Sequence, residues 1–571
     1  MKGPGIAGLV LAAALAVAAV SGPPILEALT GETELKPQVA AAISYFNQPT
    51  VETADLTPVP YTGVNPFGVN TFLEQEVEEW KIRRTLELIR AAGIKWVRQQ
   101  IPWADVEPFR KGDFRWEKYD RIIDLVNAYG LELVARLDYP PDWSRQDNTV
   151  AFGPPDNVKD YGDFVEAFVR RYRGKVRFLQ VWNEPNVFPE WGNRPVNAEE
   201  YVALLREAYL RAKGANPEAV VLSAALAPTL GTGDGRAESD LVFLDKMYRA
   251  GAGRYFDILA AQAYGLWTGP GDRRVSPDRT NFSRVRLLRE VMVRHGDAAK
   301  PIWITELGWD ALPPDFPGLA THGRVTRAQQ ARFTADAYRR ILAEWPWVGV
   351  AFYWHFRMVT DEKRDQPVFY FGMADPNFTL QPVYYAVREL ALAEPELTYG
   401  LRQENDWAIV YSGDWWEAAD PGASLGRYRV LRGGESTLRF RVRASELKVR
   451  ARIGPGEGPM AVAVWADRGG PPLLRRQVDL SAPAESFAEI TIFRGWGPGP
   501  YRVEIRPAGA GPVFRFRTVC QVCPTGASRS AIRARSGGRT SASNHGFAAM
   551  NSRDRHEGCG RAMKGRSAPK R

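Results

Sequence analysis

The sequence predicts a (β/α)8 barrel, the TIM-barrel fold, followed by a small antiparallel β-sandwich domain. Between about residues 61 and 395, eight short apolar runs alternate with stretches of helical periodicity, as in parallel βα units. No glycine-rich phosphate loop follows the first run, which argues against the alternative, a doubly wound open sheet. After about residue 400 the helical period disappears and strictly alternating segments replace it.

The eight apolar runs are the expected strands of the barrel. They cover Phe67–Asn70, Trp96–Gln100, Glu132–Leu137, Arg177–Trp182, Val220–Ala224, Asp257–Ala263, Ile302–Glu306 and Val348–Trp354. Because function sits at the carboxyl ends of barrel strands, residues that follow different runs should face one common mouth.

Three of the intervening stretches carry helix signals. Residues 76–92 place four apolar side chains at helical spacing, namely Val77, Trp80, Leu86 and Ile89. Residues 199–213 follow Asn197, and residues 326–344 begin with Thr326; both residue types cap helix N-termini. These signals support a helix between successive strands.

The alternating segments define the second domain, which we place at residues 400–518. Residues 437–443 and 447–453 alternate strictly, with arginines on one face. Residues 461–465, 488–493 and 501–505 continue the pattern, and Gly/Pro clusters separate them. This arrangement indicates a small antiparallel sandwich or jelly roll. Trp415-Trp416 in this domain is either a carbohydrate platform or a packing surface.

The net charge of +9 arises in the C-terminal tail. Residues 519–571 hold 11 Lys and Arg residues against Asp554 and Glu557, so the preceding residues 1–518 are neutral overall. The charge therefore gives no reason to expect nucleic acid as a partner. We expect residues 519–571 to form a basic disordered tail.

All three cysteines lie in this tail. Cys520, Cys523 and Cys559 with His556 could be a zinc site, but the spacing and the Ser/Gly/Arg-rich surroundings match one poorly. The barrel has no cysteine and only three histidines, His295, His322 and His355. We expect no metal and no cofactor.

The N-terminus carries an export signal. Lys2 precedes an apolar run over residues 6–20, which is short for a membrane span and suits a signal peptide, with an uncleaved anchor as the alternative. We assign residues 1–26 to this segment and residues 27–60 to a linker. The protein is expected to be secreted or held at the cell surface, contacting the membrane only through such an anchor.

Two motifs carry the chemistry. Trp182-Asn183-Glu184-Pro185-Asn186 follows the fourth strand, and Trp303-Ile304-Thr305-Glu306-Leu307-Gly308-Trp309 contains the end of the seventh. A barrel brings both glutamates to the same mouth. Two carboxylates can break a glycosidic bond, one by donating a proton and the other by attacking the anomeric carbon. Nearby tryptophans offer flat apolar faces to sugar rings.

With these motifs, residues 61–395 resemble the retaining glycoside hydrolases of clan GH-A, most closely glycoside hydrolase family 39 or family 5-like groups. The resemblance implies that Glu184 is the acid/base and Glu306 the nucleophile. It implies that Arg98 supports the nucleophile, Tyr264 contacts it and Trp354 forms the floor of the sugar site. Many relatives have a histidine two residues before the tyrosine, where this chain has Gln262, so the sugar contacts are expected to differ.

Three further residues complete the predicted site. Asn183 should bind the sugar's 2-hydroxyl. Asp138, after the third strand, either binds sugar or caps the following loop. Trp309 either lines the cleft or is a core residue, and the same holds for His355.

The predicted function is cleavage of β-glycosidic bonds in an oligo- or polysaccharide by double displacement, with retention of configuration. A non-catalytic carbohydrate-binding scaffold for polysaccharide export is one alternative. A transglycosylase is the other, since it shares the chemistry but passes the glycosyl group to a sugar. The sugar, the linkage and the choice between exo and endo action stay open.

Overall fold

A computed structural model describes residues 27, 30–32, 34–508, 513–516 and 520–523, which all fall within one compact unit ending at Thr525. The predicted N-terminal signal segment and the tail beyond Cys523 lie outside the described residues. Within the described ranges, no helix is both long enough and apolar enough to cross a bilayer.

Eight parallel strands form the first sheet. They are β1 Phe67–Thr71, β2 Trp96–Pro102, β3 Glu132–Asp138, β4 Phe178–Val181, β5 Val220–Leu222, β6 Leu259–Tyr264, β7 Ile302–Gly308 and β8 Val348–Tyr353. Their order is β5-β4-β3-β2-β1-β8-β7-β6, and parallel bridges from Leu222 to Ile258 and from Leu226 to Ala261 join the two ends. The sheet therefore closes, and the predicted (β/α)8 barrel is confirmed.

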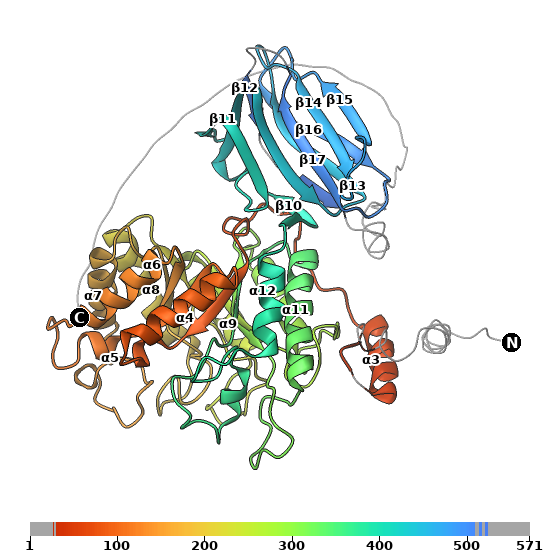
Figure 1. Cartoon of the computed structure of the whole chain (residues 1–571). Coiled ribbons are helices and arrows are strands. Elements are labelled where there is room, and N and C mark those ends of the chain that lie inside the picture. The colour runs from red at the N-terminus through yellow and green to blue at the C-terminus, as the bar shows by residue number, and fades with distance from the viewer. Residues whose placement is uncertain (1–26, 28–29, 33, 509–512, 517–519, 524–571) are drawn as a thin grey trace, which may run out of the picture. The chain divides into compact units, whose positions relative to one another are not determined.

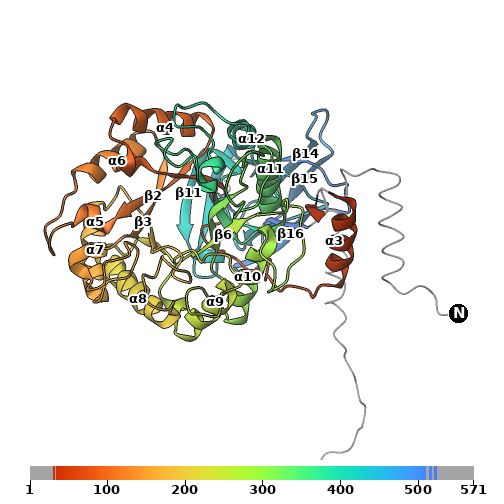
Figure 2. The same ribbon diagram turned by 90° about the horizontal axis from the view of Figure 1, so that it is seen from below.

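Helices follow the strands and surround them (Figures 1 and 2). They are α4 Glu79–Ala91, α5 Trp103–Val106, α6 Glu117–Ala128, α7 Val158–Arg171, α8 Ala198–Ala215, α9 Asp240–Arg249, α10 Val285–Arg294, α11 Arg327–Glu344 and α12 Pro382–Ala391. Both predicted caps are confirmed. The Asn197 side chain accepts from the backbone N–H of Glu200, and Thr326 forms a capping box with Gln329.

One predicted helix begins later than expected. The helix α4 starts at Glu79, so Val77 lies before it and is 91% exposed, and Trp80 in its first turn is 56% exposed. Leu86 and Ile89 do face the core. Val77 lies outside the helix because the chain is still extended at Glu78, and Trp80 lies on the exposed side of the first turn.

The segment expected to be a linker contains a helix, α3 Leu35–Asn47. The residue that follows it binds the chain after β6, since Gln48 Nε2 donates to the Arg273 carbonyl and Gln48 Oε1 accepts from the N–H of Val275. Arg274 also pairs with Glu32. Part of residues 27–60 is therefore bound to the barrel through specific contacts.

An apolar layer fills the half of the barrel interior that lies toward the N-terminal ends of the strands. Inward side chains of seven strands, β2 to β8, meet there, and Trp96, Phe178 and Trp303 form its centre, with ring centroids 5.0–5.1 Å apart. Such burial of large aromatic rings stabilises the closed barrel.

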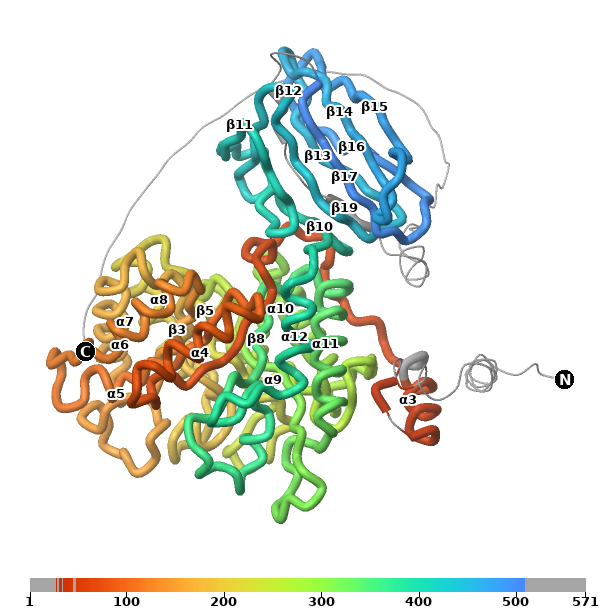
Figure 3. Tube along the Cα trace, in the orientation of Figure 1, coloured from red at the N-terminus to blue at the C-terminus, as the bar shows by residue number. Residues whose placement is uncertain are grey.

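The second sheet has eleven strands (Figure 3). They are β9 Glu396–Leu397, β10 Gly400–Arg402, β11 Ile409–Ala419, β12 Arg427–Val442, β13 Glu446–Ile453, β14 Met460–Ala466, β15 Leu474–Val478, β16 Ser486–Arg494, β17 Tyr501–Pro507, β18 Val513–Phe516 and β19 Cys520–Cys523. Apart from the parallel pair β9–β12, the pairings among the described strands are antiparallel. The predicted antiparallel β domain is confirmed.

Trp415 and Trp416 lie on β11, a strand that the alternation did not predict. Trp415 is 39% exposed, and the Arg429 guanidinium lies 4.5 Å from its ring centroid. Trp416 packs beside Tyr428 and Phe487. Trp416 therefore has the packing role, whereas one edge of Trp415 stays at the surface.

Candidate active site

Inside the barrel, a polar layer follows the apolar layer in the direction of the C-terminal ends of the strands. On β2, Trp96 belongs to the apolar layer and Arg98, two residues on, to the polar one; Phe178 and Gln180 repeat this step on β4. Side chains alternate along a strand, so a two-residue step stays on the inner face. The strands therefore carry apolar residues at the closed end and hydrogen-bonding residues near the mouth.

A bulge in β7 places Glu306 in this polar layer. Ala261 pairs with Ile304 and the next residue, Gln262, pairs with Glu306, so Thr305 has no partner in β6. Trp303 faces inward, and regular alternation would turn Thr305 inward next. The extra residue re-aims the strand and brings Glu306 inward instead.

Glu306 accepts hydrogen bonds on both oxygens. Arg98 Nη1 donates to Oε1 at 2.9 Å, and Tyr264 Oη donates to Oε2 at 2.7 Å. The side chain is 3% exposed, and Arg98 is 2% exposed. Both carboxylate oxygens are therefore held in place by hydrogen-bond donors from β2 and β6.

Arg98 is itself held in one position by three amide side chains. Its Nε donates to Gln180, its Nη1 to Asn70 and its Nη2 to Asn183, at 2.7, 2.7 and 3.1 Å. Asn70 donates in turn to the backbone carbonyls of Thr305 and Tyr353. The guanidinium is therefore fixed toward Glu306 from several strands.

Glu184 follows β4 in a loop with unusual backbone geometry. Trp182 and Glu184 have φ values of 72° and 42°, a region that non-glycine residues rarely adopt. The Glu184 N–H donates to the Ala225 carbonyl, and the Asn186 amide bonds the backbone at Ala227 and Glu238. These bonds hold the strained turn in place, as is common where a side chain must point into a site.

Gln262 on β6 bridges the two glutamates. Its Nε2 lies 2.5 Å from Glu184 Oε1 and 3.2 Å from Glu306 Oε2. Those two oxygens cannot be further apart than the sum of the two distances, about 5.7 Å. Carboxyl groups about 5–5.5 Å apart are typical of retaining glycosidases, whereas inverting enzymes need about 6.5–9.5 Å.

The pKa of Glu184 is shifted by its surroundings. Burial, followed by the negative charge of Glu306, raises the pKa of Glu184 from 4.5 to about 7. The hydrogen bond from Gln262 and the charges of Arg136 and Arg98 oppose this rise. At neutral pH, Glu184 can therefore hold a proton beside the Glu306 carboxylate, the division of roles that an acid and a nucleophile require.

The other predicted residues lie in different surroundings. Asn183 is 6% exposed and accepts from Arg98, so it belongs to the network beside both glutamates. Trp354 is half-buried at the end of β8 and packs edge-on against Phe72, 5.6 Å between centroids. A cis peptide bond joins Trp354 to His355, which is fully buried.

Asp138 and Trp309 do not present free binding groups. Asp138 pairs with Arg136 at 2.7 Å and accepts from Gln100 at 2.8 Å, and only 3% of it is exposed. Trp309 is fully buried, its indole N–H donates to the Thr268 carbonyl at 2.8 Å, and its ring packs against Phe282 and Phe333. The expected sugar contact of Trp309 does not agree with this burial, because no face of the ring is open.

Four residues of the site were not singled out from the sequence: Asn70, Arg136, Gln180 and Glu190. The first three are polar residues in barrel strands, each two positions after a residue that faces inward. A polar residue at such a position must also face inward, and this pattern could have identified them from the sequence. Glu190 lies beyond the Glu184 turn, where its carbonyl accepts from the Trp182 indole. Burial, then the charge of Glu184, raises the pKa of Glu190 well above its ordinary value.

No cluster of three or more histidine, cysteine or acidic side chains suited to a metal occurs in the described part of the chain. Cys520 and Cys523 lie on β19, but the structure does not describe their side chains. Cys559 lies outside the described residues.

Comparisons with known proteins give only distant likenesses. No family model matches the chain, and no curated protein matches it. Among solved structures, one similar chain is a family 39 glycoside hydrolase from the gut symbiont Bacteroides cellulosilyticus WH2, with 16% identity and a TM-score of 0.45 over 81% of this chain and 83% of that one. Another is a monomeric beta-xylosidase from Caulobacter crescentus CB15, with 15% identity and a TM-score of 0.43 over 80% of this chain and 98% of that one. A third is the exo-beta-1,4-mannosidase Op5Man5 from Opitutaceae bacterium strain TAV5, with 16% identity and a TM-score of 0.42 over 60% and 62%. At these scores the likenesses carry no argument about the reaction, which rests on the geometry above.

Proposed function

We propose that this protein is a retaining glycoside hydrolase that cleaves β-glycosidic bonds in an oligo- or polysaccharide. The observation that carries the proposal is the bridge of Gln262 between Glu184 and Glu306. It limits the separation of two carboxylate oxygens to about 5.7 Å in a site where one carboxyl is protonated near neutral pH and the other is bound to Arg98.

The first half of the reaction forms a glycosyl-enzyme. A Glu306 carboxylate oxygen bonds to the anomeric carbon as the bond from that carbon to the leaving oxygen breaks. Glu184 gives its proton to the leaving oxygen, so the departing sugar is a neutral alcohol. Arg98 and Tyr264 hold the Glu306 carboxylate in position before the attack.

The second half releases the product. Glu184, now ionised, takes a proton from water while the water oxygen bonds to the anomeric carbon. The bond between Glu306 and that carbon breaks, and the carboxylate returns. Two inversions at one carbon give net retention of configuration.

The fluorosugar trapping experiment tests this assignment. A 2-fluoro substituent slows the second step, so activated 2-fluoro glycosides of several sugars should label Glu306, seen by mass spectrometry of the peptide that contains it. The Glu306→Gln variant should take up no label, while the matched control Glu417→Gln, at an exposed position of β11 in the second sheet, should be labelled like the wild type.

The outcomes separate the alternatives. A label on another residue would remove Glu306 as nucleophile. If the wild type and Glu306→Gln are equally inert on a broad panel of aryl glycosides, the non-catalytic scaffold replaces the enzyme. If labelled enzyme passes its sugar to an added saccharide and releases no free reducing sugar, the protein is a transglycosylase.

Export is a second part of the proposal. The apolar run over residues 6–20 supports it, because its length fits a signal-peptide core. Cell fractionation and N-terminal sequencing of the mature protein test it; full-length protein in the cytoplasm would refute it.

A further inference from the structure

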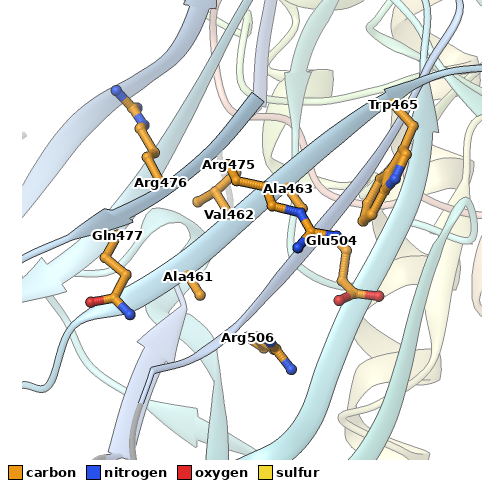
Figure 4. A pocket seen from close by; sticks show the side chains of 9 residues that line it. All are labelled: Ala461, Val462, Ala463, Trp465, Arg475, Arg476, Gln477, Glu504 and Arg506. Carbon is orange, nitrogen blue, oxygen red and sulfur yellow. The ribbon is translucent and has the colours of Figure 1, made fainter. Parts of the chain in front are cut away.

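A cavity of about 340 Å³ opens on the second sheet, among strands β14, β15 and β17 (Figure 4). Its volume lies at the small end of the range of about 300–1,000 Å³ that ligand pockets occupy. This cavity belongs to a different sheet from the candidate active site.

Strand pairing explains why this face is hollow. Ala461 pairs with Gln477 on one side and Arg506 on the other, and Ala463 pairs with Arg475 and Glu504. Paired residues of neighbouring antiparallel strands project from the same face. Two alanines thus form a low floor between long polar side chains.

Trp465 closes one end of the cavity on the same face. It lies two residues beyond Ala463, so it projects on the same side. Its side chain is half-buried, and among the described residues its ring stacks on no other aromatic ring. A half-buried indole beside a polar cavity can contact the flat apolar side of a sugar ring.

Two arginines at the cavity have no protein partner in the described structure. Arg475 and Arg506 are exposed, and neither makes an ion pair or a side-chain hydrogen bond with any described residue. Neighbouring arginines of the sheet are paired: Arg439 with Glu504 at 2.7 Å, and Arg441 with Asp467 at 2.8 Å. The two unpaired guanidiniums therefore give the cavity its positive charge.

We propose that this cavity binds an acidic polysaccharide through a uronic acid unit. A guanidinium binds a carboxylate through two parallel hydrogen bonds, and either Arg475 or Arg506 can do so. Gln477 can donate to and accept from hydroxyl groups, and Glu504 can accept from them. Trp465 supplies the apolar contact with the ring.

The charge distribution favours a sugar acid over a nucleic acid. Gln477 and Glu504 in the wall offer hydrogen-bond partners for hydroxyl groups, which a phosphodiester backbone presents sparsely, and residues 1–518 carry no net charge. A uronate ring carries one carboxylate and several hydroxyls. The two arginines can bind the carboxylate, and the side chains of Gln477 and Glu504 can bind the hydroxyls.

Calorimetric titration tests the proposal on the full chain. The Glu306→Gln background stops any hydrolysis, and the probe is a hexamer of galacturonic acid, with cellohexaose as the neutral comparison. We expect the galacturonate hexamer to bind at least tenfold more tightly than cellohexaose. The double change Arg475→Ala and Arg506→Ala should remove this difference, and Trp465→Ala should weaken binding at least tenfold.

Matched controls keep the result interpretable. Arg110→Ala with Arg254→Ala removes the same charge from exposed positions of the barrel and should leave the affinity unchanged. Arg475→Lys with Arg506→Lys should keep part of the affinity, since it keeps the charge and loses the bidentate geometry.

Three results would overturn the inference. They are equal affinity for the two hexamers, unchanged affinity in the Arg475 and Arg506 double variant, and tighter binding of a single-stranded oligonucleotide than of the galacturonate. Because the test is a binding measurement with an inactive barrel, its failure leaves the proposed hydrolysis untouched.

Discussion

Gln262 has the most direct influence on the candidate site at the scale of single residues. Its amide donates to both carboxylates, and an amide does not titrate in the working range of pH. It therefore holds Glu184 and Glu306 at one spacing without adding an ionisation of its own. A histidine at this position would add one.

Replacing Gln262 by alanine should shift the pH dependence of catalysis. The bond from Gln262 lowers the pKa of Glu184, so its loss should raise that pKa further. The alkaline limb of kcat/KM should then move to higher pH, and kcat should fall because both carboxylates lose a positioning contact. A pH profile on an aryl glycoside measures both effects; an unmoved alkaline limb would contradict the role assigned here, and Gln146→Ala, at an exposed loop, serves as the control.

The Glu184→Gln variant should lose acid catalysis selectively. Glycosides with poor leaving groups need the proton, so their kcat/KM should fall about 10²–10⁴-fold, while dinitrophenyl glycosides should lose far less in the first step. The wild-type kcat/KM should decline above about pH 7, where Glu184 loses its proton, and the variant should lack this decline. Equal losses on both kinds of substrate would show that Glu184 is not the acid.

At the scale of elements, the bulge in β7 and the turn after β4 determine which side chains enter the site. The motif around Glu306 predicted a strand end, but β7 continues to Gly308. Glu306 faces inward because the extra residue Thr305 reverses the alternation. Glu184 reaches the same space from a turn with positive φ. Neither irregularity has a sequence signal as clear as the caps at Asn197 and Thr326.

The capping box at Thr326 should stabilise the first turn of α11. Thr326→Ala removes the bond to the Gln329 N–H and should cost about 1 kcal/mol locally. Hydrogen exchange of the peptide covering the start of α11 should quicken by roughly fivefold. Thr326→Ser keeps the hydroxyl and should exchange like the wild type; equal exchange in both variants would show that the cap contributes nothing.

At the scale of the whole molecule, buried carboxyl groups link stability to pH. Asp310, next to Trp309, is fully buried, and neither side-chain oxygen has a hydrogen-bond partner in the described structure. Burial raises its pKa from 3.8 to about 7, against the opposing charges of Arg327 and Arg324. The folded state binds this proton more tightly than the unfolded state, so its stabilising contribution is present below about pH 4 and is lost as the pH rises to about 7.

The Asp310→Asn variant should therefore be the more stable protein at alkaline pH. At pH 8 its free energy of unfolding should exceed that of the wild type by an amount on the order of 2–4 kcal/mol, and its thermal midpoint should be correspondingly higher. Both differences should vanish near pH 4. Calorimetry at several pH values measures the difference. An advantage that does not change with pH would contradict the assigned titration, and Asp336→Asn at the surface of α11 is the matched control.

Local sequence patterns predicted the order of the elements and singled out the two glutamates as candidates. Apolar runs, caps and turns are local signals, so the eight barrel strands lie within two residues of their predicted limits and both predicted caps are present. Alternating segments likewise predicted five strands of the second sheet, β12, β13, β14, β16 and β17, but not the other six, which are β9, β10, β11, β15, β18 and β19.

Only the tertiary structure decided how the glutamates are arranged and which neighbours they have. Barrel closure joins β6 to β7 and β1 to β2, so Gln262, Arg98 and Glu306 meet although they are far apart in the chain. Burial, which depends on every surrounding element, separates the protonated Glu184 from the Glu306 carboxylate and places Trp309 in the core. Distance and desolvation are properties of the closed fold, and no local pattern in the chain encodes them.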